Sequence, residues 1–225
     1  ITQVLAIPPR RTTRAVIEFL THDEACALIG APDPTTWTGR RDRALLSLAV
    51  QTGLRISEMC SLTTHDIHLG TGPHITCTGK GRRQRITPLT RATVNTMTAY
   101  LAERVTRPGA ALFCGPSGQP LSRDAVEHRL AKHLAAATIV RPSLSGKHVT
   151  MHTLRHTAAM NLLAAGVDVA VIALWLGHAD THSTDAYLHA DMTIKQAALD
   201  RTRPPNVKPG TYHPQPDILA WLTAL

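Results

Sequence analysis

Apolar residues recur at the three- and four-residue spacing of amphipathic helices along most of the chain. One run at about 41–51, rich in Leu, Ala and Val, predicts a core helix that Gly53 ends. Thr21 and Glu24 have the spacing of a capping box, so we expect a helix to begin there and to end near Gly30. Further helices are predicted at about 56–62, 92–104, 122–137, 151–165, 168–175 and 193–201.

A second kind of pattern lies in the middle of the chain. Residues 74–78 and 84–89 flank Gly79, Lys80 and Gly81, an arrangement typical of a β-hairpin with a basic tip. Helices dominate the rest and no other strand pair is indicated. The sequence therefore predicts a mainly α protein with a small antiparallel β-sheet, an α+β fold class.

Composition divides the chain into three parts. Residues 1–17 include IPPRRTTR, which has no periodic pattern and predicts an extended basic linker. Residues 18–203 hold most of the predicted elements and are expected to form the main domain. Residues 204–225 begin with a proline-rich stretch and end in DILAWLTAL, whose Asp cap and apolar stripe predict a short C-terminal helix.

Net charge narrows the class of partner. The 225 residues carry a formal net charge of +8 at pH 7, and 13 histidines add positive charge in mildly acidic conditions. An excess of this sign favours a polyanion such as DNA or RNA, although an unrelated basic protein shows the same balance. Aromatic residues make up only 4% of the chain, so base stacking on an aromatic platform is not the expected binding mode.

Several classes of site are disfavoured. The four cysteines form no CxxC pair, which argues against a zinc site or a disulfide framework and favours reduced thiols in a cytoplasmic protein. The longest apolar stretch, 164–176, contains Asp168 and is shorter than the ~20 residues of a membrane span. No DxD or paired-carboxylate motif indicates a two-metal nuclease. We therefore expect no metal or other cofactor, no membrane contact and no small-molecule substrate.

A scattered set of polar residues indicates the chemistry. Five side chains that can donate hydrogen bonds to phosphate oxygens precede one phenol, a combination suited to attack on a phosphodiester. The set is Arg55 in TGLRISE, Lys80 in TGKGRRQR, His152 and Arg155 in HTLRH, His178 in LGH, and Tyr187. Of the two other tyrosines, Tyr100 is expected to be a packing residue and Tyr212 lies in the proline-rich tail.

Two of these donors share one predicted helix. His152 and Arg155 are three residues apart, so they project about 60° from each other on one face. Leu154 and Leu162 are expected to anchor another side of the helix in the core. Taken alone, the pair is equally typical of a solvated helix face. His156 is interpreted as a supporting or structural histidine.

Arg55 follows a break at Thr52-Gly53-Leu54 that can turn its side chain into a cleft. Its planar fork can hold two oxygens of one phosphate. Glu58 lies three residues later on the same face and is predicted to orient Arg55 or a site histidine, in a supporting role. The alternative for Glu58 is a weak surface ion pair.

The hairpin tip is strongly basic. Lys80 lies beside Arg82, Arg83 and Arg85, and these three arginines are expected to contact the nucleic-acid backbone. The whole run could instead steer phosphates without taking part in chemistry. His178 follows a short apolar helix at a Gly, which gives its ring a fixed direction, and its alternative is a core histidine.

The six residues occur in the order found in the tyrosine recombinases, the phage-integrase family. The chain resembles that family from about Thr21 to Arg203. The resemblance implies a catalytic domain in which Tyr187 attacks the scissile phosphate of double-stranded DNA, forms a 3′-phosphotyrosyl bond and releases a 5′ hydroxyl. A 5′ hydroxyl from a partner strand then reseals the DNA, so no cofactor is needed.

The resemblance also implies a role for each of the other five residues. Lys80 would protonate the leaving 5′ oxygen, which requires neighbouring cations and partial desolvation to lower its pKa. Arg55, Arg155 and His178 would stabilise charge on the non-bridging phosphate oxygens. His152 would assist proton movement.

Family members carry further parts around this domain. The resemblance implies that the basic linker joins the catalytic domain to a small helical DNA-clamping domain, which we expect to lie outside this sequence. Residues 217–225 are expected to dock on a neighbouring protomer within a DNA-bound homotetramer. The alternative is docking in cis on the same domain.

Two other functions stay open from the sequence. A type IB topoisomerase uses similar residues but acts as a monomer and reseals the same strand. A DNA-binding module that has lost catalysis would bind without cutting. The chain length and the order of HTLRH, LGH and the tyrosine favour a recombinase that serves integration, excision, transposition or resolution.

Overall fold

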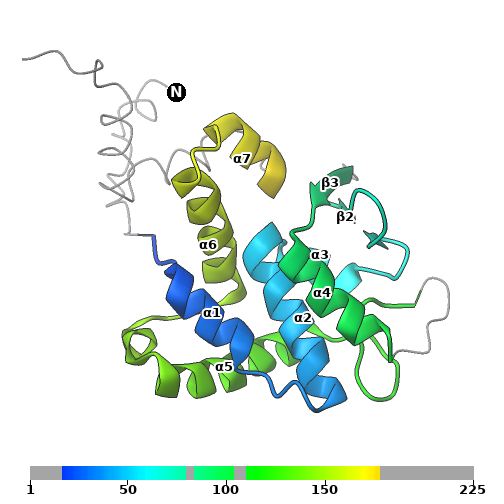
Figure 1. The fold of residues 1–225 in the computed structure, drawn as a ribbon, viewed down its shortest axis with the longest axis horizontal. Coiled ribbons are helices and arrows are strands. Elements are labelled where there is room, and N and C mark those ends of the chain that lie inside the picture. Colours follow the sequence, from blue (N-terminus) through cyan, green and yellow to red (C-terminus); the bar gives the residue numbers. More distant parts are fainter. Residues whose placement is uncertain (1–16, 80–83, 104–109, 178–225) are drawn as a thin grey trace, which may run out of the picture. The chain divides into compact units, whose positions relative to one another are not determined.

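The computed structural model of the chain describes residues 17–79, 84–103 and 110–177 (Figure 1). Helices dominate these ranges, with one three-stranded antiparallel sheet, so the predicted fold class is confirmed. The elements are α1 His22–Gly30, α2 Trp37–Thr52, α3 Ile56–Ser61, β1 Ile67–His68, β2 His74–Thr78, β3 Gln84–Pro88, α4 Arg91–Leu101, α5 Arg123–Val140, the 3₁₀ helix η3 Pro142–Gly146, α6 Met151–Ala164 and α7 Val169–Leu176.

Most helices begin where a short polar side chain accepts a hydrogen bond from a free N–H of the first turn. The predicted capping box of α1 is confirmed: Thr21 Oγ1 accepts from the N–H of Glu24, and Glu24 Oε2 accepts from the N–H of Thr21. The other helices with a side-chain cap start at Thr36, Thr90, Ser122, Thr150 and Asp168. Local chemistry thus fixes where these helices start.

Some boundaries differ from those the sequence predicts. α2 begins about one turn early, at Trp37, because Thr36 accepts a hydrogen bond from the N–H of Gly39. β1, only two residues long, was not predicted. The predicted helices at 193–201 and near the C-terminus lie outside the described residues, as does most of the 1–17 linker.

The sheet has the order β1-β2-β3, and the predicted hairpin supplies β2 and β3. Cys77 of β2 pairs with Arg85 of β3, and Thr76 pairs with Ile86. Side chains alternate between the two faces of β3, so Thr87 is buried whereas Ile86 is 67% exposed. Arg85 therefore lies on the same face of β3 as the buried Thr87.

The core forms around α2, which contacts α1, α4 and α6. Figure 1 shows α2 with α6 on one side and α4 on the other. Leu45, Leu46 and Leu48 are almost completely buried. The predicted packing role of Tyr100 is confirmed, since its ring is fully buried and its hydroxyl donates to the carbonyl of Leu112.

A buried polar cluster joins α2 to α5. Arg41 is fully buried and donates two hydrogen bonds to Asp42 Oδ1 and one to the carbonyl of Cys114. His133 Nε2 lies 2.9 Å from Asp42 Oδ2. Burial alone would raise the pKa of Asp42, but His133 and Arg41 outweigh it and hold that pKa below its usual range. The cluster satisfies charges that would be costly to bury unpaired.

None of the helices within 17–79, 84–103 and 110–177 has both the length and the apolarity needed to cross a membrane. The four cysteines all lie in these ranges and are free.

Candidate functional site

The structure describes part of the predicted site. Arg55, Glu58, Arg85, His152 and Arg155 lie within the described residues. Lys80, Arg82, Arg83, His178 and Tyr187 lie outside them.

Three of the described residues meet at one cavity of about 300 Å³. Arg55 comes from the start of α3, whereas His152 and Arg155 come from the first turns of α6. The full lining is Arg55, Ile56, Glu127, Thr150, Met151, His152 and Arg155. Two arginines and one histidine from segments about 100 positions apart in the sequence thus line the same space.

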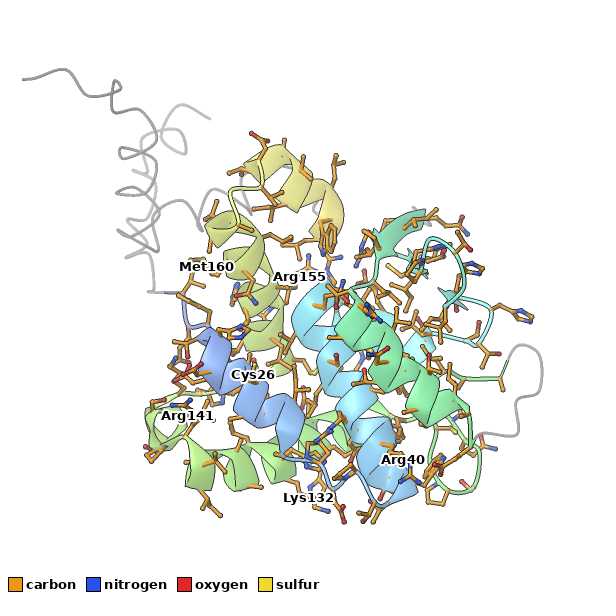
Figure 2. All side chains as sticks on the ribbon, in the orientation of Figure 1. Cys26, Arg40, Lys132, Arg141, Arg155 and Met160 are labelled. Carbon is orange, nitrogen blue, oxygen red and sulfur yellow. The ribbon has the colours of Figure 1, made fainter. Side chains whose placement is uncertain are left out.

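Arg155 is the most constrained of the three. It is 3% exposed, and its Nη1 donates to the carbonyl of Gly53 at 2.6 Å while its Nη2 donates to the carbonyl of Leu176 at 2.7 Å. These carbonyls lie at the C-terminal ends of α2 and α7, where a cation is favoured. Figure 2 shows Arg155 on α6 near the C-terminal end of α2. The solvated-face interpretation therefore does not hold for Arg155.

Arg55 is held less tightly and is more open. Its Nη2 donates to the carbonyl of Gly177 at 3.1 Å, and its side chain is 40% exposed. Gly53, in the left-handed conformation at φ 62°, ends α2 just before it. A Cβ at position 53 would lie 2.6 Å from Leu176 Cδ2, so another residue would be strained at this φ and would require the Leu176 side chain to shift. The predicted break thus directs Arg55 to the cavity.

Glu58 holds two arginines at once. Its carboxylate accepts from the N–H and Nη1 of Arg55, at 2.8 and 3.1 Å, and from Nη1 and Nη2 of Arg85, at 3.0 and 2.7 Å. The side chain is 5% exposed, so the surface ion-pair alternative does not hold. Burial alone would raise the pKa of Glu58, but the hydrogen bonds from Arg85 and Arg55 lower it below the usual range. Glu58 is therefore ionised at neutral pH.

Arg85 occupies a different place from the one expected. The sequence grouped it with Arg82 and Arg83 as a contact to the nucleic-acid backbone, but its side chain is 12% exposed and both terminal nitrogens bind Glu58. Strand alternation was the signal that could have shown this, because Arg85 shares a face with Thr87. Hydrophobicity alone would assign the buried face of β3 to Ile86, which lies between Arg85 and Thr87 but is exposed.

His152 and His156 form an edge-to-face pair one turn apart, with ring centroids 4.3 Å apart. Burial and the charges of Arg155 and Arg55 lower the pKa of His152. Burial, together with His152 and Arg155, lowers the pKa of His156 to about 4. Both rings are therefore neutral at neutral pH. His152 can accept a proton, and His156 contacts it as a supporting histidine would.

The opposite side of α6 packs largely as expected. Leu154 is fully buried as predicted, whereas Leu162 is only partly buried. At 3.6 residues per turn, Leu162 lies about 80° around α6 from Leu154, so the two side chains do not share one buried line.

Acid should destabilise the fold through His156. Its folded pKa of about 4 lies below the ordinary value of 6.5, so the unfolded chain binds more protons between these values. The contribution of His156 to the free energy of unfolding is then fully present above pH 6.5, and it is lost as the pH falls toward 4. Urea midpoints from pH 7.5 to 4.5 should fall less steeply in His156→Gln than in the wild type.

The matched control for this prediction is His128→Gln, which removes an exposed histidine from α5. It should keep the wild-type pH dependence. Parallel losses of stability in the wild type and in His156→Gln would contradict the assignment.

Two polar residues of the cavity lining, Glu127 and Thr150, escaped the sequence argument. Glu127 lies on the exposed side of α5, and Thr150 caps α6. Neither belongs to a motif, and only the packing of α5 against α3 brings Glu127 to the cavity. Among the described side chains, no group of three or more His, Cys, Asp or Glu is placed to hold a metal ion.

Comparison with known proteins gives the family. Residues 18–193 match the phage integrase family. The chain is 47% identical over 225 residues to a protein of Sinorhizobium fredii named as an integrase/recombinase, y4rC, and spans 68% of its length. It is 36% identical over 193 residues to the tyrosine recombinase XerC of Chlamydia muridarum, covering 84% of this chain and 59% of that protein. The chain therefore belongs to the phage integrase family, as its resemblance predicted.

Solved structures agree with this assignment. The crystal structure of XerA recombinase superposes with a TM-score of 0.70 at 27% identity, covering 84% of this chain and 66% of that one. A post-cleavage complex of the XerH site-specific recombinase with palindromic difH substrate gives a TM-score of 0.69 at 24% identity, covering 82% of this chain and 53% of that one. The second likeness concerns the fold alone.

Proposed function

We propose that this chain carries the catalytic domain of a site-specific recombinase that breaks and rejoins double-stranded DNA through Tyr187. The observation that carries the proposal is the meeting of Arg55, His152 and Arg155 at one cavity in a chain of the phage integrase family. The net charge of +8 suits a DNA partner. The XerH structure bound to its difH substrate supports the same partner class.

Each described residue of the site has a separate role at the scissile phosphate. Arg55, which is partly exposed at the cavity, offers its fork to two non-bridging oxygens. Arg155 adds a second guanidinium whose position is fixed by two backbone carbonyls. His152, neutral because its pKa is lowered, takes up the proton that the attacking phenol releases. Each preorganised donor contributes roughly 10²–10³ in rate.

Lys80, His178 and Tyr187 complete the proposed reaction. The phenol oxygen of Tyr187 forms a bond to phosphorus, the bond from phosphorus to the 5′ oxygen breaks, and Lys80 protonates that oxygen. His178 hydrogen-bonds a non-bridging oxygen. Attack by a 5′ hydroxyl of a partner strand reverses these steps and releases Tyr187. One phosphodiester replaces another, so the energy of the bond is conserved.

We assign the catalytic domain to 18–203, the preceding residues to a basic linker and 204–225 to an assembly tail that joins protomers in a DNA-bound homotetramer. The family match over 18–193 supports the first of these limits. Arg82 and Arg83 remain proposed contacts to the DNA backbone. The recombinase names of the relatives favour strand exchange over topoisomerase-like resealing or binding without cutting.

Covalent trapping tests this function without knowledge of the DNA site. The full chain is mixed with a pool of duplexes that carry a nick next to a randomised segment, so that cleavage releases a short fragment and cannot be reversed. We expect protein–DNA adducts that resist denaturation and form in the presence of a chelator. Sequencing the trapped DNA gives the cleaved site.

The same experiment separates the alternatives. Cleaved DNA without a protein adduct, or binding without cleavage, would contradict the proposal. Sedimentation of the complex on the selected duplexes should give four protomers per pair of sites. A single protomer on each duplex at all concentrations would contradict the tetramer and favour topoisomerase-like action.

A further inference from the structure

We propose that Arg85 is a positioning residue of the recombination site and not a contact to DNA. It acts by holding the Glu58 carboxylate, which in turn fixes Arg55 at the cavity. This inference rests on the proposed function, since it assigns a role in the same reaction.

The contacts of Arg85 are those of a fixed support. Its two terminal nitrogens meet the two oxygens of Glu58 in a parallel pair of hydrogen bonds, at 3.0 and 2.7 Å. Charge-assisted pairs of this geometry are strong and directional. The same two oxygens receive the N–H and Nη1 of Arg55. Glu58 therefore holds one arginine from the sheet and one from the start of α3.

A second contact closes the arrangement. Gly177, at φ 64°, ends α7 in the left-handed conformation, and a Cβ on it would lie 2.7 Å from Nη1 of Arg85. The guanidinium of Arg85 thus lies directly on this turn, whose carbonyl also accepts from Nη2 of Arg55. Arg55, Glu58, Arg85 and Gly177 form a closed ring of contacts, which we call the Glu58 ring. The ring joins α3, β3 and the end of α7.

The exposure of the two arginines separates their roles. Arg55 is 40% exposed and lines the cavity, so it can offer nitrogens to a phosphate. Arg85 is 12% exposed and is not among the residues that line the cavity, and its terminal nitrogens bind Glu58. Moving Arg85 to a phosphate would leave a buried carboxylate with half of its partners, which is strongly unfavourable.

Removal of Arg85 should therefore act through Arg55. Glu58 would lose two of its four hydrogen bonds and would be free to rotate toward Arg55, shifting the guanidinium that faces the phosphate. A displacement of about 1 Å at a reacting group lowers a rate by roughly 10²-fold. DNA affinity, which depends on other cations, should change little.

The test uses Arg85→Ala in the full chain, on the nicked duplex selected by covalent trapping. The matched control is Arg91→Ala, which removes the same charge from an exposed position at the start of α4. With DNA in excess, we expect Arg85→Ala to form the adduct roughly 10- to 100-fold more slowly than the wild type and Arg91→Ala to react normally. Dissociation constants and their salt dependence should be alike in all three proteins.

A double-mutant cycle with Glu58→Gln identifies the route. If Arg85 acts through Glu58, the Arg85→Ala change should reduce the rate of adduct formation little further in the Glu58→Gln background. Arg85→Lys keeps the charge but cannot form the paired hydrogen bonds, so it should recover less than half of the lost rate on a logarithmic scale. Guanidinium ion, against sodium at equal ionic strength, should speed Arg85→Ala but not the double variant.

Each contrary outcome has a distinct meaning. A salt slope lower by about 1 in Arg85→Ala, with equal costs in both backgrounds, would make Arg85 a DNA phosphate contact and overturn the inference. A wild-type rate in folded Arg85→Ala would do so too, leaving Arg85 a role in stability alone. Both outcomes leave the proposed function intact, whereas an absence of adduct with the wild type removes the function and this role together.

Discussion

Tyr187→Phe should form no covalent adduct with the selected nicked duplex, while binding that duplex as well as the wild type does. Phenylalanine lacks the oxygen that bonds to phosphorus, and no other group is expected to replace it. The lost hydroxyl is uncharged at neutral pH, so the electrostatic part of DNA binding stays the same. Denaturing gels measure the adduct, and fluorescence anisotropy measures the affinity.

Tyr100→Phe is the matched control for this variant. Tyr100 is fully buried and does not line the cavity, and its hydroxyl donates to the carbonyl of Leu112, so the change removes that hydrogen bond. We expect a loss of about 1 kcal/mol in stability and an unchanged yield of adduct. Adduct formation by Tyr187→Phe at the wild-type rate would end the proposed mechanism.

Arg155→Ala should have the second largest effect, because Arg155 is both a phosphate donor in the proposed reaction and a structural anchor. Its loss removes one preorganised cation, which is expected to slow cleavage by roughly 10²–10³-fold. It also leaves the carbonyls of Gly53 and Leu176 without this donor and opens a cavity at a position that is 3% exposed. The combined cost in stability should be about 2–4 kcal/mol.

Stability and chemistry can be separated for this residue. Arg155→Lys retains the charge, but a single ammonium cannot reach both carbonyls in the geometry of the guanidinium. We expect an intermediate melting temperature and a cleavage rate that stays well below the wild-type rate. The rates are compared below the melting temperature of each variant. An unchanged cleavage rate in folded Arg155→Ala would contradict the role of Arg155 at the phosphate.

The parts of the fold that the sequence predicted correctly are those set by local signals. The capping box at Thr21 acts within one turn, so α1 was found close to its true bounds, and the spacing of apolar residues placed α6 equally well. β1 was missed because a two-residue strand has no periodicity of its own and exists only through its pairing with β2. The early start of α2 depends on one further local cap, at Thr36.

The site shows where local reasoning ends. The order of polar residues predicted the chemistry, and the break at Gly53 predicted the direction of Arg55. The partners of these residues come from distant segments, however, and no sequence pattern connects Arg85 to Glu58 or Arg155 to the carbonyl of Leu176. Charge alone made Arg85 look like its neighbours at the hairpin tip. Its burial follows from strand register, which tertiary packing decides.

The most direct test of the account is to locate the residue that carries the DNA. The trapped adduct is digested with protease and nuclease, and mass spectrometry identifies the peptide that retains a nucleotide. The account predicts a 3′-phosphotyrosyl linkage at Tyr187. A nucleotide attached to any other residue, or a 5′ linkage, would contradict it.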